Sequence, residues 1–182
     1  VCKQGNPLDS TFDGNMLYIN NNGVYRETAA AYSLNLKGYS RDALFFDYDN
    51  DSDLDLIVGF WPFDKSGNII KSLNFSFEYY TITDSVSNTH PHLYQNTGDG
   101  FVDVTINAGL SLFNSFTNSI TASDIDGNGF VDLFVGNDFI GRDFMYLNNG
   151  NGTFSDIALT ALNQASLGSM GVDIADVDND LK

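Results

Sequence analysis

The chain has 182 residues, of which 42% are hydrophobic and 14% aromatic, a content that excludes a disordered protein. Its formal net charge of −16 argues against binding to nucleic acid or to an anionic membrane surface, since both are negatively charged. Asp supplies 22 of the 24 acidic residues. Because Asp favours turns and is a hard oxygen ligand, this bias predicts acidic loops and not acidic helix faces.

The first predicted element is a β-hairpin over residues 16–29, "MLYINNNGVYRETA". The same order of a Tyr-containing strand, an Asn/Gly or Asp-Gly turn and a second strand recurs over 92–105 and 144–157. Asn, Asp and Gly tolerate the positive φ angles that tight hairpins require. We therefore expect three copies of one hairpin.

A second element alternates with these hairpins and consists of an apolar strand, an Asp-rich loop and another apolar strand. It spans residues 43–60, 120–139 and 171–182, and the third copy is incomplete. No long segment shows the 3.6-residue periodicity of an amphipathic helix. The sequence thus predicts strands joined by acidic loops and hairpin turns.

The spacing of the copies reveals a repeat with one insertion. Tyr94 and Tyr146 lie 52 residues apart, whereas Tyr18 and Tyr94 lie 76 apart. The additional residues fall within 61–91, which contains the single Trp and His90, with His92 directly after it. Exposed aromatic side chains there would suit contact with a protein or glycan partner, and the alternative is that they pack against a neighbouring unit.

Four antiparallel strands in a unit of about 50 residues are typical of a β-propeller blade. We therefore predict an all-β fold in which 1–182 form an incomplete β-propeller. Its predicted parts are the end of a preceding blade (14–40), a blade with the insertion 61–91 (41–116), a second blade (117–160) and the start of a third (161–182).

The acidic loops carry oxygen side chains at alternate positions, which can converge when the backbone curls around an ion. A backbone carbonyl usually fills position 7, so Asp53, Phe130 and Lys182 would serve there. Hard oxygen ligands in such number suit Ca²⁺, which takes roughly 6 to 8 oxygens. The predicted metal residues are, in the first loop, Asp47, Asp49, Asp51, Asp53 and Asp55, in the second, Asp124, Asp126, Asn128, Phe130 and Asp132, and in the third, Asp176, Asp178 and Asp180.

Other interpretations of these loops fit less well. An EF-hand needs Glu at position 12 and flanking helices, but that position is Val58 or Val135 and the flanks are strands. Mg²⁺ prefers a few carboxylates with waters, and Zn²⁺ prefers His or Cys. A merely solvated acidic surface remains the alternative.

The loop D-x-D-x-D-G-x-x-D, followed by "VDLFVGNDF" and "MYLNNGNGTFSDI", resembles the FG-GAP/VCBS repeat. That repeat builds the propellers of integrin α subunits and of many bacterial secreted proteins. The sequence of these motifs is similar to bacterial relatives of cartilage acidic protein. The resemblance implies seven-bladed propellers with Ca²⁺ in the loop joining the first two strands. Position 6, often Gly, is Gly129 in the second loop but Ser52 in the first and Leu181 in the third.

A ring of seven blades would need roughly twice this length, so we expect the remaining blades to come from missing sequence or a partner chain. The leading hypothesis is a non-catalytic, Ca²⁺-binding module of a secreted or cell-surface protein that mediates adhesion through protein or glycan binding. The alternatives are the propeller of a polysaccharide-degrading or phospholipase-type enzyme and a structural spacer.

No nucleophile motif or phosphate loop is present. His90 and His92 could face one side of a strand as metal ligands, but strand-edge positions are the preferred interpretation.

Overall fold

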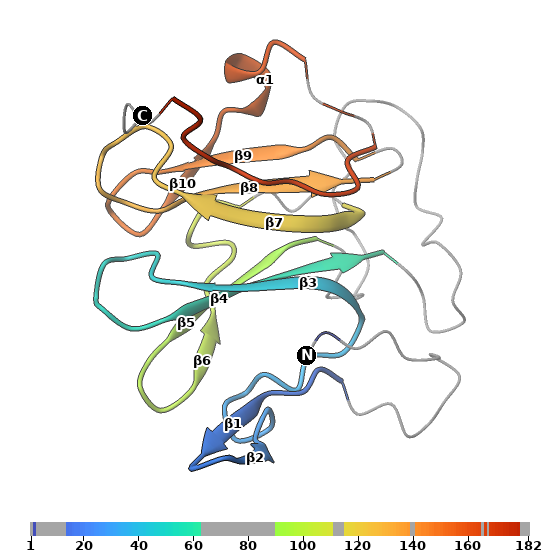
Figure 1. Cartoon of the computed structure of the whole chain (residues 1–182), viewed down its shortest axis with the longest axis vertical. Helices are drawn as coiled ribbons and strands as arrows, with labels where there is room; N and C mark the ends of the chain where they lie inside the picture. Colours follow the sequence, from blue (N-terminus) through green and yellow to red (C-terminus); the bar gives the residue numbers. More distant parts are fainter. Residues whose placement is uncertain are drawn as a thin grey trace.

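The structure of the chain is a computed structural model that describes residue 2 and residues 14–62, 90–110, 115–138, 141–164, 166 and 168–178. The strands in these residues form one two-stranded and two four-stranded antiparallel sheets, which lie one above another in Figure 1. The prediction of an all-β fold with four-stranded antiparallel sheets is confirmed. The one helix among the described residues, α1 (Ala158–Ala161), is a single turn, so none is long and apolar enough to cross a membrane.

The two-stranded sheet is the first predicted hairpin. It pairs β1 (Tyr18–Asn21) with β2 (Val24–Glu27) around a turn in which Asn22 and Gly23 both have positive φ. The bond from the Thr28 amide to the Leu17 carbonyl closes this hairpin, and equivalent bonds close the hairpins of the other two sheets. The three hairpins are therefore copies of one structural unit.

The two four-stranded sheets repeat the same order of strands. The first, in the order β3-β4-β5-β6, consists of β3 (Tyr39–Phe46), β4 (Asp55–Trp61), β5 (His92–Asn96) and β6 (Phe101–Asp103). The second, in the order β7-β8-β9-β10, consists of β7 (Thr117–Ser123), β8 (Asp132–Asn137), β9 (Phe144–Asn148) and β10 (Phe154–Asp156). Even the irregularities recur, because the register shifts between Ser40 and Asp42 in β3 and between Thr117 and Ser119 in β7.

The larger of two core clusters lies between the two four-stranded sheets. The Asp42 side chain in β3 accepts a hydrogen bond of 2.7 Å from the Ile120 amide in β7, so polar contacts also join the sheets. Apolar side chains from both sheets form one buried cluster, whose members include Phe46, Tyr48, Ile57, Leu93, Ile120, Leu133, Val135, Phe144, Tyr146 and Phe154. A second buried cluster consists of Leu56, Val58, Phe60 and Tyr94 of the first sheet with Ala29 and Leu34. Of the three repeated tyrosines, Tyr94 and Tyr146 are buried in the core clusters, whereas Tyr18 in the two-stranded sheet is 45% exposed.

Two glycines allow the sheets to approach closely. A Cβ atom on Gly59 in β4 would lie 2.3 Å from Cγ2 of Thr117 in β7, well inside van der Waals contact. A Cβ atom on Gly136 in β8 would lie 2.5 Å from Cγ2 of Val172. Residues 169–178 thus lie on the second sheet as β7 lies on the first, and Figure 1 shows this C-terminal segment running across β8.

This close approach predicts that Gly59→Ala destabilises the protein. The added methyl group has to displace the buried Thr117 side chain, and overpacking of this kind costs about 1–3 kcal/mol. Urea denaturation monitored by tryptophan fluorescence measures the loss. Gly171→Ala is the matched control, since nothing lies within 4 Å of its Cβ position, and equal midpoints for both variants would contradict the close-approach interpretation.

Candidate metal centres

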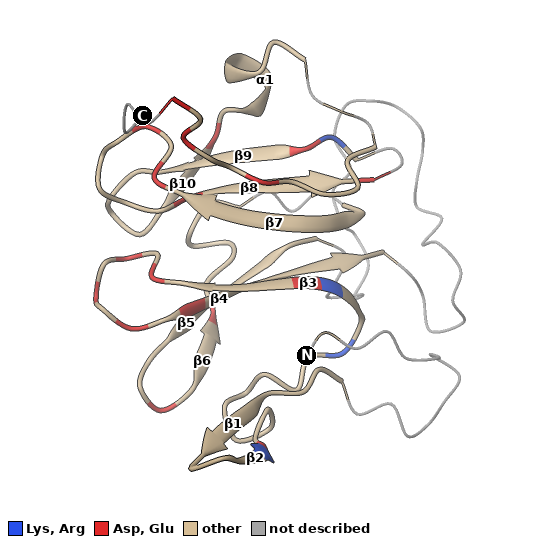
Figure 2. Cartoon of the chain, viewed as in Figure 1, with Lys and Arg blue, Asp and Glu red and all other residues tan. Residues whose placement is uncertain are grey.

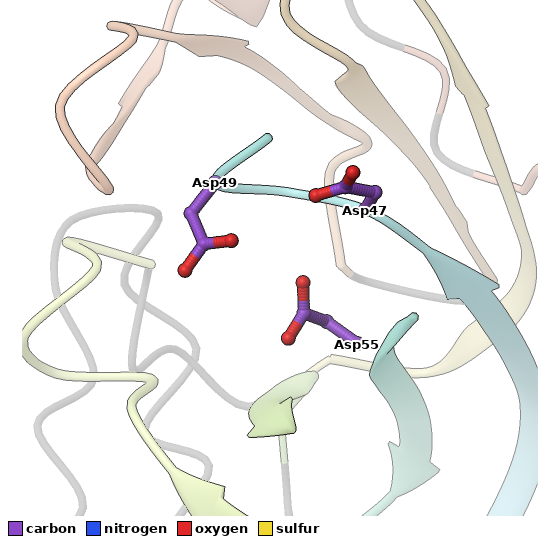
Figure 3. Close-up of side chains that lie close together, drawn as sticks. All are labelled: Asp47, Asp49 and Asp55. Carbon is purple, nitrogen blue, oxygen red and sulfur yellow. The ribbon is translucent and has the colours of Figure 1, made fainter. Parts of the chain in front are cut away.

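The first acidic loop joins β3 to β4 and brings three carboxylates together. One oxygen from each of Asp47, Asp49 and Asp55 lies within 4.8 Å of the others. In Figure 3 the three side chains point toward one another around an open space. These residues occupy positions 1, 3 and 9 of the predicted ligand pattern.

The conformation of this loop is set by its first aspartate. The Asp47 carboxylate accepts hydrogen bonds from the amides of Asp51 (3.2 Å) and Ser52 (3.0 Å), four and five residues further along the loop. Asn50 and Ser52 adopt positive φ angles of 61° and 75° to make this turn. Ser52 therefore builds the sharp turn at position 6 without the glycine that the repeat often has there.

The second acidic loop, between β7 and β8, has the same construction. One oxygen from each of Asp124, Asp126 and Asp132 lies within 4.8 Å of the others. The Asp124 carboxylate accepts hydrogen bonds from the amides of Asn128 (3.0 Å) and Gly129 (2.9 Å). Both loops project from the same edge of their sheets, as the red segments on the left of Figure 2 show.

The ninth position of the first loop is a fully buried carboxylate. Asp55 is 0% exposed and accepts hydrogen bonds from the amides of Tyr48 (3.0 Å) and Asn96 (2.9 Å). Burial raises the pKa of Asp55 to about 6, although these two amides act in the opposite direction. The neighbouring carboxylates Asp49 and Asp53 raise it further, so the ionised form lacks a compensating positive charge.

Asp132 plays the same part in the second loop. It is 0% exposed and accepts hydrogen bonds of 2.7 Å from the amides of Ile125 and Asn148. Burial raises its pKa, the Asn148 and Ile125 amides lower it, and Asp126 raises it. In each loop one buried carboxylate thus joins the acidic loop to the third strand of the sheet.

These groups fit a bound cation. Two unit charges about 4 Å apart repel by about 4 kcal/mol at an effective dielectric constant of 20, and each loop crowds three carboxylates. One oxygen of Asp49 accepts a hydrogen bond from Gln95 (2.9 Å), but the other, Oδ1, is buried without a hydrogen-bond partner. An all-oxygen donor set with an unsatisfied buried oxygen is suited to a hard divalent ion.

Positions 5 and 7 are not in the two carboxylate groups. At position 5, Asp51 accepts a hydrogen bond from the Asp53 amide (3.0 Å), and Asn128 accepts one from the Phe130 amide (2.8 Å). The Asn128 side chain also donates to the carbonyl of Asn148 (3.0 Å). The position-5 side chains therefore brace the loop backbone in this structure, and metal ligation by positions 5 and 7 stays a prediction.

The third loop is described only in part. Asp176 and Asp178 are exposed and belong to neither carboxylate group, while Asp180 and Lys182 lie outside the described residues. Metal binding by this loop stays a prediction.

The sequence interpretation missed two asparagines that support the acidic loops. Asn96 and Asn148 end β5 and β9, and their amides bind the buried carboxylates of Asp55 and Asp132. A signal was present, because each Asn stands two residues after the repeated tyrosine, in "YQN" and "YLN". The sequence pattern indicated only that each Asn begins a turn. It could not show which carboxylate the backbone amide binds, because Asp55 and Asp132 are remote in sequence from Asn96 and Asn148.

The two histidines are buried, each 7% exposed, and His92 begins β5, an inner strand, so the expected strand-edge position is wrong. Their rings stack with centroids 4.3 Å apart and 22° between the planes. The lone pair of an imidazole nitrogen lies in the plane of its ring. Because the two rings are stacked, an ion bound by one ring would lie outside the plane of the other, so the two histidines are poorly placed to share a metal. His92 instead contacts the Asp103 carboxylate at 2.8 Å. Burial raises the pKa of Asp103, but hydrogen bonds from His92 and Thr105 outweigh it and lower the pKa to about 2.

The described ends of the insertion 61–91 are packed. Trp61 donates a hydrogen bond to the Thr117 carbonyl (3.0 Å) and lies edge-on to Phe116. Residues 63–89 lie outside the described residues, so a binding role for the insertion stays a prediction.

The comparison with protein families agrees with the repeat that the loops and hairpins define. Residues 124–182 match the FG-GAP-like repeat. The matched stretch begins at the first aspartate of the second acidic loop and includes β8, β9 and β10. The FG-GAP-like repeat thus carries the second carboxylate group, and the first sheet reproduces its geometry outside the matched residues. A comparison with curated proteins finds no match.

The buried histidine pair predicts a loss of stability in acid. Burial, with a smaller effect of His92, lowers the pKa of His90 to about 4, while Asp103 acts against it. His90 therefore becomes protonated near pH 6.5 in the unfolded chain but only near pH 4 in the folded chain. Its titration lowers the free energy of unfolding as the pH falls from about 6.5 to about 4. The slope from this group is at most about 1.4 kcal/mol per pH unit.

Urea denaturation at several pH values between 7 and 4, in chelator, measures this slope. His90→Gln cannot titrate, so it should lose less stability than the parent chain across the same window, while the titration of the aspartates cancels in the comparison. Parallel curves for the two proteins would show that His90 does not titrate as its burial predicts.

Proposed function

We propose that the chain is a calcium-binding β-propeller module of a secreted or cell-surface protein, with a non-catalytic role in adhesion. The observation that supports this proposal best is the repetition of the carboxylate group. Asp47, Asp49 and Asp55 in one sheet correspond to Asp124, Asp126 and Asp132 in the next, in equivalent hydrogen-bond frameworks. An incidental acidic surface has no reason to bury a carboxylate at the same place in successive units.

Calcium is the ion that this donor set suits best. The carboxylates of each group would hold it, with further oxygens from positions 5 and 7, and its charge would convert their mutual repulsion into attraction. Mg²⁺ keeps more of its water and Zn²⁺ prefers nitrogen or sulfur. Ca²⁺ near millimolar concentration outside cells would fill even weak sites of this kind, which is the reason for proposing an extracellular location.

The ion's proposed role is structural. It would fix the loop between the first two strands of each sheet and hold that loop to the third strand through the buried Asp55 or Asp132. In this proposal the sheets are blades of a seven-bladed ring completed by further chain, and loops on one face contact a protein or glycan partner. The FG-GAP-like repeat in residues 124–182 supports the blade assignment.

Calcium should raise the thermal stability of the chain. At a Ca²⁺ concentration 100 times the Kd, one site adds about 2.7 kcal/mol to the free energy of unfolding. For a chain of this size the melting temperature rises by roughly 5–10 °C per site. Differential scanning fluorimetry with Ca²⁺ and with chelator measures the shift, and identical melting temperatures would refute the calcium assignment.

Removing one ligand should remove about half of that stabilisation, since one of two sites is lost. Asp124→Ala takes a carboxylate from the second group and also the two amide hydrogen bonds that shape the loop. Asp99→Ala, in an exposed hairpin turn outside both groups, is the control of equal charge change. An equal response of the two variants to Ca²⁺ would indicate that the loops are only acidic surface.

A further inference from the structure

Asn148, the last residue of β9, lies between the two acidic loops. It is 1% exposed, and its amide donates to the buried carboxylate of Asp132 in the second loop at 2.7 Å. Its side-chain nitrogen donates to the Tyr48 carbonyl in the first loop, also at 2.7 Å. One buried residue thus contacts both loops through strong, short hydrogen bonds.

The position of Tyr48 makes this contact consequential. Tyr48 stands between Asp47 and Asp49, two of the three carboxylates of the first group, and its own amide donates to the third, Asp55. A bond that holds the Tyr48 carbonyl therefore restrains the backbone from which Asp47 and Asp49 extend and whose amide binds Asp55. The same Asn148 fixes a carboxylate of the second group on its other side.

A second contact joins the loops directly. The Asn50 side chain in the first loop donates to the Gly129 carbonyl in the second loop at 3.2 Å. The Gly129 amide in turn donates to Asp124, the first ligand of the second group. The two loops are therefore linked by one buried and one exposed hydrogen bond.

We propose that Asn148 couples the two metal loops, so that an ion bound in one raises the affinity of the other. This inference rests on the proposed calcium binding. An ion in the first loop orders the backbone around Tyr48, and this order is transmitted through Asn148 to Asp132. The second ion then meets a loop whose ordering cost has been lowered, and the effect is reciprocal because it is a coupling of binding free energies.

The matched residue in the other sheet provides a control. The Asn96 amide donates to Asp55 at 2.9 Å and its side chain donates to the Leu54 carbonyl at 3.3 Å, just as Asn148 binds Asp132 and Val131. Among the described residues the Asn96 side chain bonds only within its own sheet and loop. Asn96 thus has the structural role of Asn148 without the contact to a second acidic loop.

Isothermal titration of the full chain with CaCl₂ tests the coupling. In the parent, Asp49→Asn disables the first loop. The Kd of the second loop for Ca²⁺ should then be at least about fivefold higher than it is when the first loop is filled. In an Asn148→Ala background the backbone amide to Asp132 is kept but the link to Tyr48 is lost, so Asp49→Asn should leave the second site unchanged. Asn96→Ala should retain the parental coupling.

The outcomes separate the inference from the proposed function. Two sites that bind Ca²⁺ independently in the parent would overturn the coupling alone, whereas no Ca²⁺ uptake by the parent would overturn both. Parental coupling in Asn148→Ala, or equal loss in Asn96→Ala, would also refute the role of Asn148. If Asn148→Ala does not fold, Asn148→Ser replaces it, since the shorter side chain lacks the amide nitrogen that donates to the Tyr48 carbonyl, and undiminished coupling there would overturn the inference.

Discussion

The structure depends on the burial of one carboxylate at the start of the second strand of each sheet. Asp55 and Asp132 are removed from water and held by two backbone amides each, one from the acidic loop and one from the end of the third strand. A charge in this position has to be matched, and the amides match it only in part. The rest of the negative charge would be compensated by a cation among the three carboxylates. The shape of the loop and the binding of an ion therefore depend on the same buried charge.

The local features of the fold were predictable because neighbouring residues determine them. Asn-Gly and Asp-Gly turns, strand alternation and the spacing of the tyrosines led to the four-stranded sheets, and alternate aspartates indicated the acidic loops. The geometry of each ligand was not predictable in the same way. Whether Asp51 faces the other carboxylates or the Asp53 amide depends on the turn that Asp47 imposes, and Asn148 reaches Tyr48 across 100 residues of sequence.

The histidine pair shows a different limit of sequence reasoning. Alternation correctly placed His90 and His92 on one side of the chain, but it cannot distinguish an inner strand from an edge strand. Their burial became clear only from the position of β5 between β4 and β6, where Phe60 lies edge-on to His92 at 5.7 Å. The Asp103 carboxylate from β6 supplies the polar contact that makes one buried imidazole acceptable.

The close approach at Gly59 and Gly136 has a consequence for how such chains can grow. A glycine in the second strand receives the following segment of the chain at both junctions, through Thr117 of β7 in one case and through Ser169 and Val172 of the C-terminal segment in the other. The front and back surfaces of a unit are therefore complementary to each other. A tandem duplication of the 52-residue unit would present a matching pair of surfaces at its new junction, so these sheets can multiply or be exchanged without a redesigned interface.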